Sequence, residues 1–146
     1  MLRGIDPILS PDLLRILRAM GHGDELVIAD ANFPGESSAR TLVRLDGVDA
    51  TQALHAVLSV MPLDAFVDDP AISMQIVDDP ENLPPVVARF QEIIDTVADN
   101  PAPIKPVERF AFYERARRAF AIVQTGEQRH YGNIIVKKGV LPSKQD

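Results

Sequence analysis

The ten residues GHGDELVIAD, numbered 21–30, decide how this chain folds. Residues 26–29 form a short aliphatic run between turn-forming residues, a pattern typical of a buried strand rather than a helix. A histidine between two glycines precedes the run, and a carboxylate follows it. Because a strand rises about 3.3 Å per residue, His22 and Asp30 should lie at its opposite ends. The two side chains meet at one site only if the loops fold back or another subunit supplies the missing half.

The composition of the 146 residues is that of one soluble globular domain. A hydrophobic fraction of 46% and a charged fraction of 25% are ordinary for this class. The net charge of -6, with no basic stripe, predicts no nucleic-acid partner. No apolar segment is long enough to span a bilayer and no signal peptide is visible, so we expect no membrane partner and a cytoplasmic location. The absence of cysteine removes disulfides, thiol nucleophiles and thiolate metal sites.

Capping signals mark the helices. Ser10 before Pro11 is a typical helix start, and Asp49 with Gln52 three residues later forms a capping-box pattern. The predicted helices cover residues 11–20, 49–61 and 85–98, and residues 107–119 also favour a helix. The predicted strands cover residues 26–29, 41–45, 65–67, 72–77, 120–123 and 133–136. Residues 31–40 are interpreted as a polar loop and residues 99–106 as a proline-rich connector.

The alternation of strands and helices predicts an α/β fold. We expect a single three-layer domain over residues 1–146, in which a largely parallel or mixed sheet is flanked by helices. Ligands of α/β folds usually bind in the turns at a sheet edge. The turns beside the predicted strands are therefore where chemistry is expected.

His22 is the leading candidate for chemistry. An imidazole with a pKa near 6.5 exchanges a proton close to neutral pH, and the flanking glycines let a ligand approach. The alternative is a structural histidine that caps carbonyls of the preceding helix. His55 is interpreted as a packing or surface residue. His130 is interpreted as solvated, and its position next to Tyr131 keeps it a candidate. The spacing of His22 and Asp24 could suit a metal, but no third ligand stands nearby, so no metal site is predicted.

Polar and aromatic residues gather in the second half of the chain. Arg109, Tyr113, Tyr131 and Asn133 offer planar donors, phenols and an amide, which suit a neutral polyhydroxylated ligand better than a phosphate. The alternative is that the aromatic residues pack the helix while Arg109 forms a surface ion pair. Asp30 could accept hydrogen bonds from hydroxyl groups or orient an imidazole, and it could equally begin an Asx-turn.

Five motifs spread along the chain carry a family resemblance. They are MGHGD at 20–24, DANFP at 30–34, RFAFYERA at 109–116, TGE at 125–127 and YGNI at 131–134. Together they resemble the ribose pyranase / fucose mutarotase family, and the arginine-aromatic stretch favours its L-fucose mutarotase branch. The likeness covers nearly the whole chain, to KKGV at 137–140. Asn32 and residues 35–40 depart from the family pattern, which leaves loop contacts and fine sugar preference open.

The resemblance implies an isomerase that interconverts the α and β anomers of a free monosaccharide, L-fucose in the first place, without cofactor or metal. It implies that His22 is the proton-donating residue. It also implies a homo-oligomer, often a decamer of two pentameric rings, with sites near subunit contacts. The sugar-binding residues that it implies are Asp30, Arg109, Tyr131, Gly132 and Asn133.

Anomer exchange suits these residues because it is acid–base chemistry that needs no nucleophile. The ring oxygen gains a proton while the anomeric hydroxyl loses one, the open aldehyde rotates about C1–C2, and the ring closes on the other face. We expect His22 to exchange the proton and Tyr131 to provide the complementary path. Three alternatives stay open: a ribose pyranase that interconverts pyranose and furanose forms, a non-catalytic monosaccharide-binding accessory protein, and a purely structural oligomer.

Overall fold

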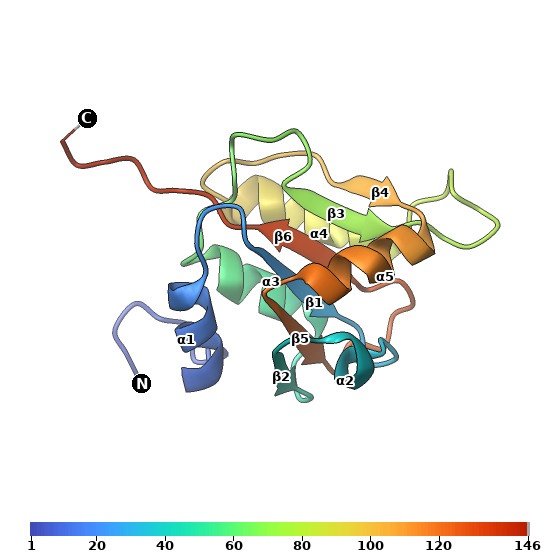
Figure 1. Ribbon diagram of the computed structural model, residues 1–146, viewed down its shortest axis with the longest axis horizontal. Helices are drawn as coiled ribbons and strands as arrows, with labels where there is room; N and C mark the ends of the chain where they lie inside the picture. Colours follow the sequence, from blue (N-terminus) through green and yellow to red (C-terminus); the bar gives the residue numbers. More distant parts are fainter. Residues whose placement is uncertain (146) are drawn as a thin grey trace.

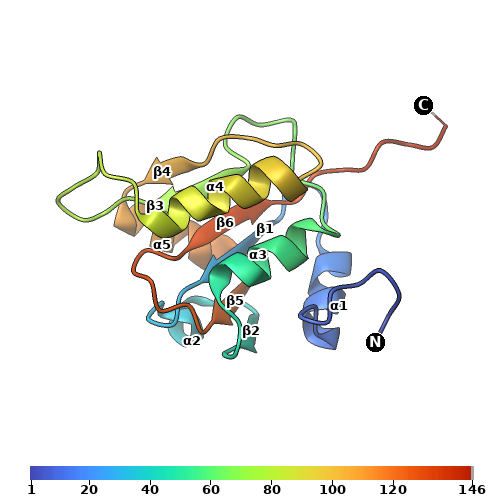
Figure 2. The same cartoon turned by 180° about the vertical axis from the view of Figure 1, so that it is seen from behind.

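Six strands form one mixed sheet, and helices cover both of its faces (Figure 1). This computed structural model describes residues 1–145. Along the chain the elements are α1 (Pro11–Ala19), β1 (Glu25–Ala29), α2 (Gly35–Ser38), β2 (Leu42–Leu45), α3 (Ala50–Leu58), β3 (Ala71–Met74), α4 (Pro85–Val97), β4 (Lys105–Val107), α5 (Arg109–Arg118), β5 (Ala121–Thr125) and β6 (Ile134–Lys137). Helices α3 and α4 lie against one face of the sheet and α5 against the other (Figure 2). The predicted three-layer α/β fold is confirmed.

The strand order is β2-β5-β1-β6-β3-β4. Strands β2, β5 and β1 are parallel, as are β3 and β4, and β6 lies antiparallel between β1 and β3. All strands except β6 therefore point the same way. The five parallel strands finish at the same end of the sheet, where the antiparallel β6 starts with Ile134. This end of the strands, which includes Ala29 and Met74, is called the C-terminal edge below. The opposite margin is the N-terminal edge.

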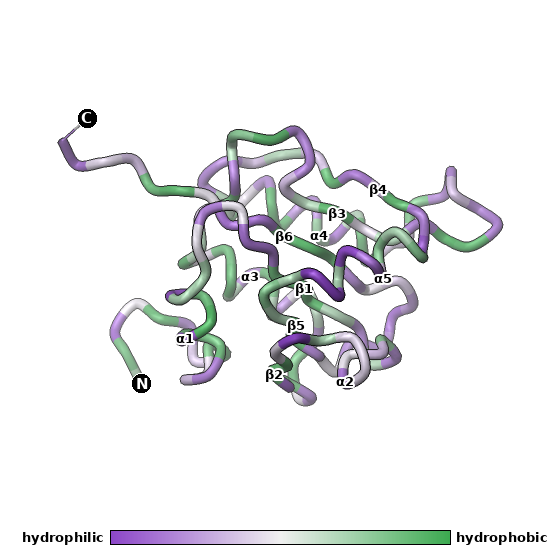
Figure 3. Tube along the Cα trace, in the orientation of Figure 1, coloured by the Kyte–Doolittle hydropathy of each residue, from purple (hydrophilic) through white to green (hydrophobic). Residues whose placement is uncertain are grey.

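Strand β1 is buried on both faces. Leu26 and Ile28 belong to the core cluster that includes residues of α3 and α4, while Val27 and Ala29 belong to the cluster around α5. All four are 0% exposed. Burying a large aliphatic side chain contributes about 1.5–3 kcal/mol, so a continuous apolar run is what a double-sided central strand requires. Figure 3 shows hydrophobic residues along the central strands, whereas the loops contain both hydrophilic and hydrophobic residues.

The predicted helix starts are confirmed by their caps. The Ser10 side chain accepts a hydrogen bond from the N–H of Leu13, with Pro11 in the first turn of α1. Asp49 and Gln52 form the reciprocal capping box of α3. Helix α3 ends at Leu58, three residues earlier than predicted. These ends are locally encoded because each cap satisfies backbone donors that the helix itself leaves unpaired.

The structure corrects four expectations about secondary structure. Residues 65–67 form bends rather than a strand, because Phe66 donates its N–H to the Asp64 carboxylate at 3.2 Å and Phe66 projects outward with 74% exposure. The run at 72–77 is a strand only to Met74. The supposed connector contains the short strand β4, and the polar loop contains the four-residue helix α2. Strand β4 forms because β3 offers it a free parallel edge, a partner that its own sequence does not reveal.

Candidate functional site

A cavity of about 260 Å³ opens at the C-terminal edge. Its volume is near the lower end of the roughly 300–1,000 Å³ typical of ligand pockets, so it suits one small molecule. Its walls come from the ends of β1, β3 and β6, from the start of α5 and from the loop between β5 and β6. The lining residues are Asp30, Asn32, Phe33, Met74, Val77, Arg109, Tyr113, His130, Tyr131 and Asn133.

Asp30 and Asn133 form a reciprocal pair at the base of this cavity. The backbone N–H of Asp30 donates to Asn133 Oδ1 at 2.7 Å, and Asn133 Nδ2 donates to Asp30 Oδ2 at 3.0 Å. Both residues are buried. The pair forms because Asp30 directly follows the end of β1 and Asn133 directly precedes the start of the antiparallel β6. Asp30 also accepts the N–H of Asn32, so it is an Asx-turn residue as well as a wall of the pocket.

Burial raises the pKa of Asp30. Desolvation raises the pKa of its carboxyl above the ordinary value, and hydrogen bonds from Asn32 and Asn133 oppose that rise. A carboxylate in this position has already shed much of its water. It is therefore prepared to accept a hydrogen bond from a hydroxyl group of a ligand.

Tyr131 has an unusual backbone that turns its side chain toward β3. Its φ is +62°, a left-handed conformation that is uncommon for residues other than glycine. Its phenol oxygen accepts the N–H of Val77 at 3.0 Å, which leaves the phenol proton free to be donated. Gly132 follows, and a Cβ there would lie 2.6 Å from Cγ of Glu127. The tight turn therefore requires glycine next to a residue in a strained conformation.

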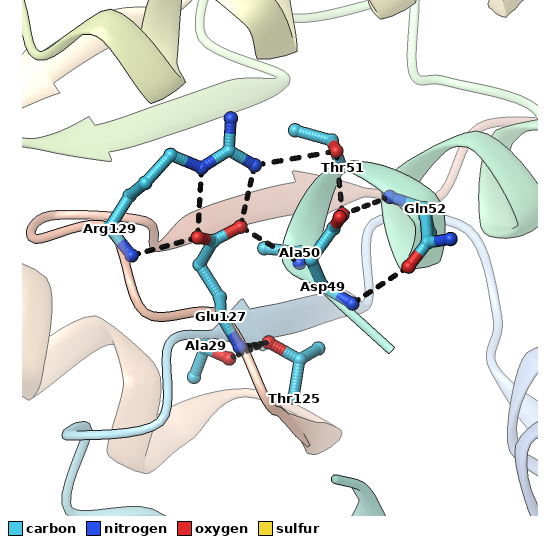
Figure 4. Close-up of polar contacts among 8 residues, drawn as sticks. All are labelled: Ala29, Asp49, Ala50, Thr51, Gln52, Thr125, Glu127 and Arg129. Carbon is cyan, nitrogen blue, oxygen red and sulfur yellow. Dashed lines mark hydrogen bonds and ion pairs between the residues drawn. The ribbon is translucent and has the colours of Figure 1, made fainter. Parts of the chain in front are cut away.

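A buried carboxylate, that of Glu127, holds the loop between β5 and β6 (Figure 4). It accepts hydrogen bonds from the N–H, Nε and Nη2 of Arg129 and from the N–H of Ala50 at the start of α3. Its backbone N–H donates to Thr125 Oγ1, and its carbonyl accepts the N–H of Ala31. Glu127 thereby ties α3, β5 and the segment after β1 to the loop that carries Tyr131.

Arg109 supplies an unpartnered donor. Its Nε is buried and has no hydrogen-bond partner, alone among buried side-chain nitrogen and oxygen atoms of residues 1–145. Its guanidinium stacks over the ring of Phe110, 4.7 Å from the centroid. Within the described chain it forms no ion pair, so the surface ion pair considered above is not seen. A buried N–H without a partner is costly, and its position at the pocket suggests that a ligand oxygen satisfies it.

His22 lies apart from this pocket, at the N-terminal edge. It is in the turn between α1 and β1, and Gly23 with φ +88° completes that turn. Strand β1 spans about 13 Å between its first and last residues, so His22 and Asp30 lie at opposite sheet edges of the same chain. The His22 ring does not cap α1, because Lys138 Nζ donates to the carbonyls of Leu17 and Met20 there. Its Nε2 contacts Asp64 Oδ1 at 3.0 Å instead.

With Gly132 buried in the adjoining turn, the pocket brings together five of the sequence-predicted residues, which are Asp30, Arg109, Tyr113, Tyr131 and Asn133. His130, which the sequence interpretation took as solvated but kept as a candidate beside Tyr131, is exposed and lines the cavity. Sequence reasoning did not foresee Val77, whose backbone N–H binds the Tyr131 phenol. Asp64 was also missed, because an aspartate in an irregular segment carries no local signal of its partner.

Two wider features of residues 1–145 bear on the class of protein. No group of three His, Asp or Glu side chains in this range is placed to hold a metal ion. None of its helices has the length and apolar character needed to cross a bilayer.

The fold and the pocket define an α/β protein with a small polar site for a compact ligand rich in hydrogen-bonding groups. Residues 3–141 match the model of the RbsD / FucU transport protein family. The chain is 44% identical over 144 residues to an L-fucose mutarotase of Histophilus somni, covering 99% of this chain and 100% of that one. It is 46% identical to a fucose mutarotase of Danio rerio, covering 99% and 97% of the two chains.

Solved structures give the same result. The crystal structure of the fucose mutarotase from Streptococcus pneumoniae in complex with L-fucose matches with a TM-score of 0.90 and 42% identity, over 97% of this chain and 100% of that one. Bacillus subtilis RbsD complexed with D-ribose matches with a TM-score of 0.73 at 21% identity, which shows a shared fold alone. This chain belongs to the RbsD / FucU family, as the motifs indicated.

Proposed function

We propose that this protein is an isomerase that interconverts the α and β anomers of free L-fucose by opening and reclosing the sugar ring. The observation that carries the proposal is that the polar pocket lies in a chain that matches, along its whole length, a fucose mutarotase solved with L-fucose. The pocket supports the proposal chemically. It offers a desolvated carboxylate, an unpartnered guanidinium N–H, an amide and a phenol, all of which bind hydroxyl groups.

The pocket residues have distinct roles in this proposal. Asp30, Arg109 and Asn133 hold the hydroxyl groups, which keeps the open-chain aldehyde bound while its C1–C2 bond rotates. Tyr131 gives or takes one proton through its phenol, and His22 exchanges the other with the ring or anomeric oxygen. General acid–base catalysis of this kind contributes about 10²–10⁴ in rate.

We infer that the site is shared between subunits, because His22 lies at the opposite end of β1 from the pocket of its own chain. Phe66, whose ring lies 5.4 Å from that of His22, is 74% exposed at the N-terminal edge. Phe110, which stacks on Arg109 at the pocket, is 65% exposed. We infer that these two apolar surfaces meet when copies of the chain associate head to tail, so that each pocket receives His22 from a neighbour. Head-to-tail contacts generate a ring when the rotation between neighbours closes. We therefore propose a homo-oligomer built from such rings, of the decameric kind, in the cytoplasm.

Saturation transfer between the anomeric NMR signals of L-fucose tests the activity. His22→Ala should reduce exchange to the spontaneous rate, while L-fucose still raises the thermal midpoint because the pocket is intact. His55→Ala, on the exposed face of α3, is the matched control and should exchange like the unaltered protein. Faster interconversion of D-ribose than of L-fucose would contradict the substrate. A bound sugar that exchanges only spontaneously with the unaltered protein would favour the accessory binding protein.

Mixing two inactive variants tests the shared site. His22→Ala and Arg109→Ala damage opposite edges, so co-assembled rings regain some interfaces with both residues intact. Random assembly of equal amounts should restore about a quarter of the activity. His22→Ala mixed with His22→Gln is the control and should restore none. No recovery in the first mixture, with mixed rings verified by mass spectrometry, would contradict a site between subunits.

A further inference from the structure

Asp64 is a buried carboxylate for which the proposed reaction has no use so far. Its side chain is 2% exposed, whereas that of His22, which it contacts at 3.0 Å, is 44% exposed. It lies just after Leu63, which pairs with Lys138 in an isolated β-bridge. Sequence separates Asp64 from His22 by 42 positions, so the contact is a product of the tertiary fold.

The position of Asp64 is fixed from several sides. Its backbone N–H donates to the carbonyl of Lys137 at 3.0 Å, and its Oδ1 accepts the N–H of Phe66 at 3.2 Å. The backbone of Gly139 approaches so closely that a Cβ there would lie 2.8 Å from Cα of Asp64. The carboxylate is therefore a rigid support for the more exposed imidazole.

Asp64 stays ionised in this setting. Burial raises the pKa of the carboxyl, but the hydrogen bonds from Phe66 and His22 and the positive charge of Lys137 outweigh it and hold the pKa below the ordinary value. An ionised carboxylate only accepts hydrogen bonds. The nitrogen that faces it, Nε2 of His22, must therefore carry a hydrogen.

We propose that Asp64 is a positioning residue that fixes the tautomer of His22, with the hydrogen on Nε2, so that Nδ1 is the nitrogen that exchanges a proton with the sugar. The inference deepens the proposed function and rests on it. In the neutral ring one nitrogen donates and the other accepts, so holding the hydrogen on Nε2 leaves a basic Nδ1. When Nδ1 takes a proton, the imidazolium is stabilised by the adjacent negative charge of Asp64.

Nitrogen-15 NMR of histidine-labelled protein reads the tautomer directly. In the unaltered protein, the His22 signals should report a hydrogen on Nε2 and a bare Nδ1. Asp64→Asn should produce a mixture of tautomers, since an amide can donate to Nε2 as well as accept from it. Asp24→Asn is the matched control. It removes a carboxylate from the same turn, where Asp24 accepts the N–H of Gly21, and should leave the tautomer unchanged.

Kinetics completes the test. Asp64→Asn should lower kcat for anomer exchange about tenfold to a hundredfold, a part of the general acid–base contribution, with KM unchanged because Asp64 lies outside the pocket. A His22 tautomer with the hydrogen on Nδ1 in the unaltered protein would overturn the inference without any variant. A mixed tautomer with unchanged kcat would overturn the positioning role. If His22→Ala also exchanges normally, the proposed role of His22 in catalysis fails instead, while the tautomer result stands.

Discussion

At the scale of single residues, the pocket contains a carboxyl group, that of Asp30, whose ionised form is disfavoured by burial. Because the pKa of Asp30 is raised in the folded protein above its ordinary value of 3.8, the folded state holds that proton more tightly than the unfolded chain does. Ionisation of Asp30 therefore lowers the free energy of unfolding as pH rises from 3.8 through the raised pKa of the folded state. Asn133 limits this cost because its Nδ2 donates a hydrogen bond to the Asp30 carboxylate. Because the ionised Asp30 carboxylate lowers stability, its presence at this buried position is better explained by a role in ligand binding.

Replacing Asn133 by alanine should expose this cost. The substitution leaves the buried N–H of Asp30 without an acceptor and its carboxylate with one donor fewer, so we expect a loss of about 1–3 kcal/mol in the free energy of unfolding. L-Fucose binding should weaken as well, because the carboxylate is no longer held in place. Urea denaturation and calorimetric titration measure the two effects. Asn82→Ala, which removes an exposed hydrogen bond to Asp79, should change neither.

At this scale, sequence reasoning found the residues that have a local signal in the sequence and missed those whose role depends on a distant partner in the fold. Asp30, Arg109 and the turn at residues 131–133 stood out because they are polar residues beside apolar strands or within recognisable motifs. Asp64 did not, because its importance arises from a distant partner, His22.

At the scale of elements, the loop between β5 and β6 behaves as one unit with the start of α3. The carboxylate of Glu127 is its centre, since it accepts hydrogen bonds from both Arg129 and Ala50. The hydrogen bonds from the Arg129 side chain lead the causes that hold the pKa of Glu127 below its ordinary value of 4.5. Folding therefore favours the ionised form, and the resulting stability is present above pH 4.5 and is lost as pH falls toward the lowered folded-state value.

Glu127→Gln should remove this pH dependence. The free energy of unfolding of the unaltered protein should fall as pH drops below about 4.5, and the variant should show a flatter slope in that window together with a loss of about 1–3 kcal/mol at neutral pH. Urea denaturation between acid and neutral pH provides the measurement. Identical slopes for the two proteins would contradict the role assigned to the carboxylate.

The helices and central strands could be predicted because their signals are local. Ser10, Asp49 and the aliphatic residues of β1 each satisfy a requirement of their own element. Strand β4 and the bends at residues 65–67 could not be predicted. The first depends on the free edge of β3, and the second on a hydrogen bond to the Asp64 side chain. The Asp64 carboxylate takes the N–H of Phe66, which turns the chain outward just where its apolar residues suggested a strand.

At the scale of the whole molecule, the two halves of the proposed site face away from each other. The sequence indicated this separation through the length of β1 alone, and the structure shows His22 at one sheet edge and the pocket at the other. What one chain could not reveal is the surface on which copies meet. Apolar residues of a core and of an interface look alike in a sequence, and only their exposure distinguishes Phe66 from its buried neighbours.

Phe66→Ser should separate association from folding. Since the side chain is 74% exposed, its loss should leave the circular dichroism spectrum of the fold unchanged. We expect light scattering to show a smaller assembly and NMR to show slower anomer exchange, because each pocket loses the neighbouring His22. An assembly of unchanged mass would show that this residue lies outside the contact.

The place of β6 in the sheet has a consequence for biosynthesis. The β2-β5-β1 group and the β3-β4 pair are joined only through β6, which leaves the ribosome after all of them. Until then the hydrogen bonds that join the two groups of strands cannot form, and each group has an unpaired strand edge of the kind that promotes aggregation. The same late event brings Asn133 to Asp30, so the proposed sugar site is completed at the same time as the sheet.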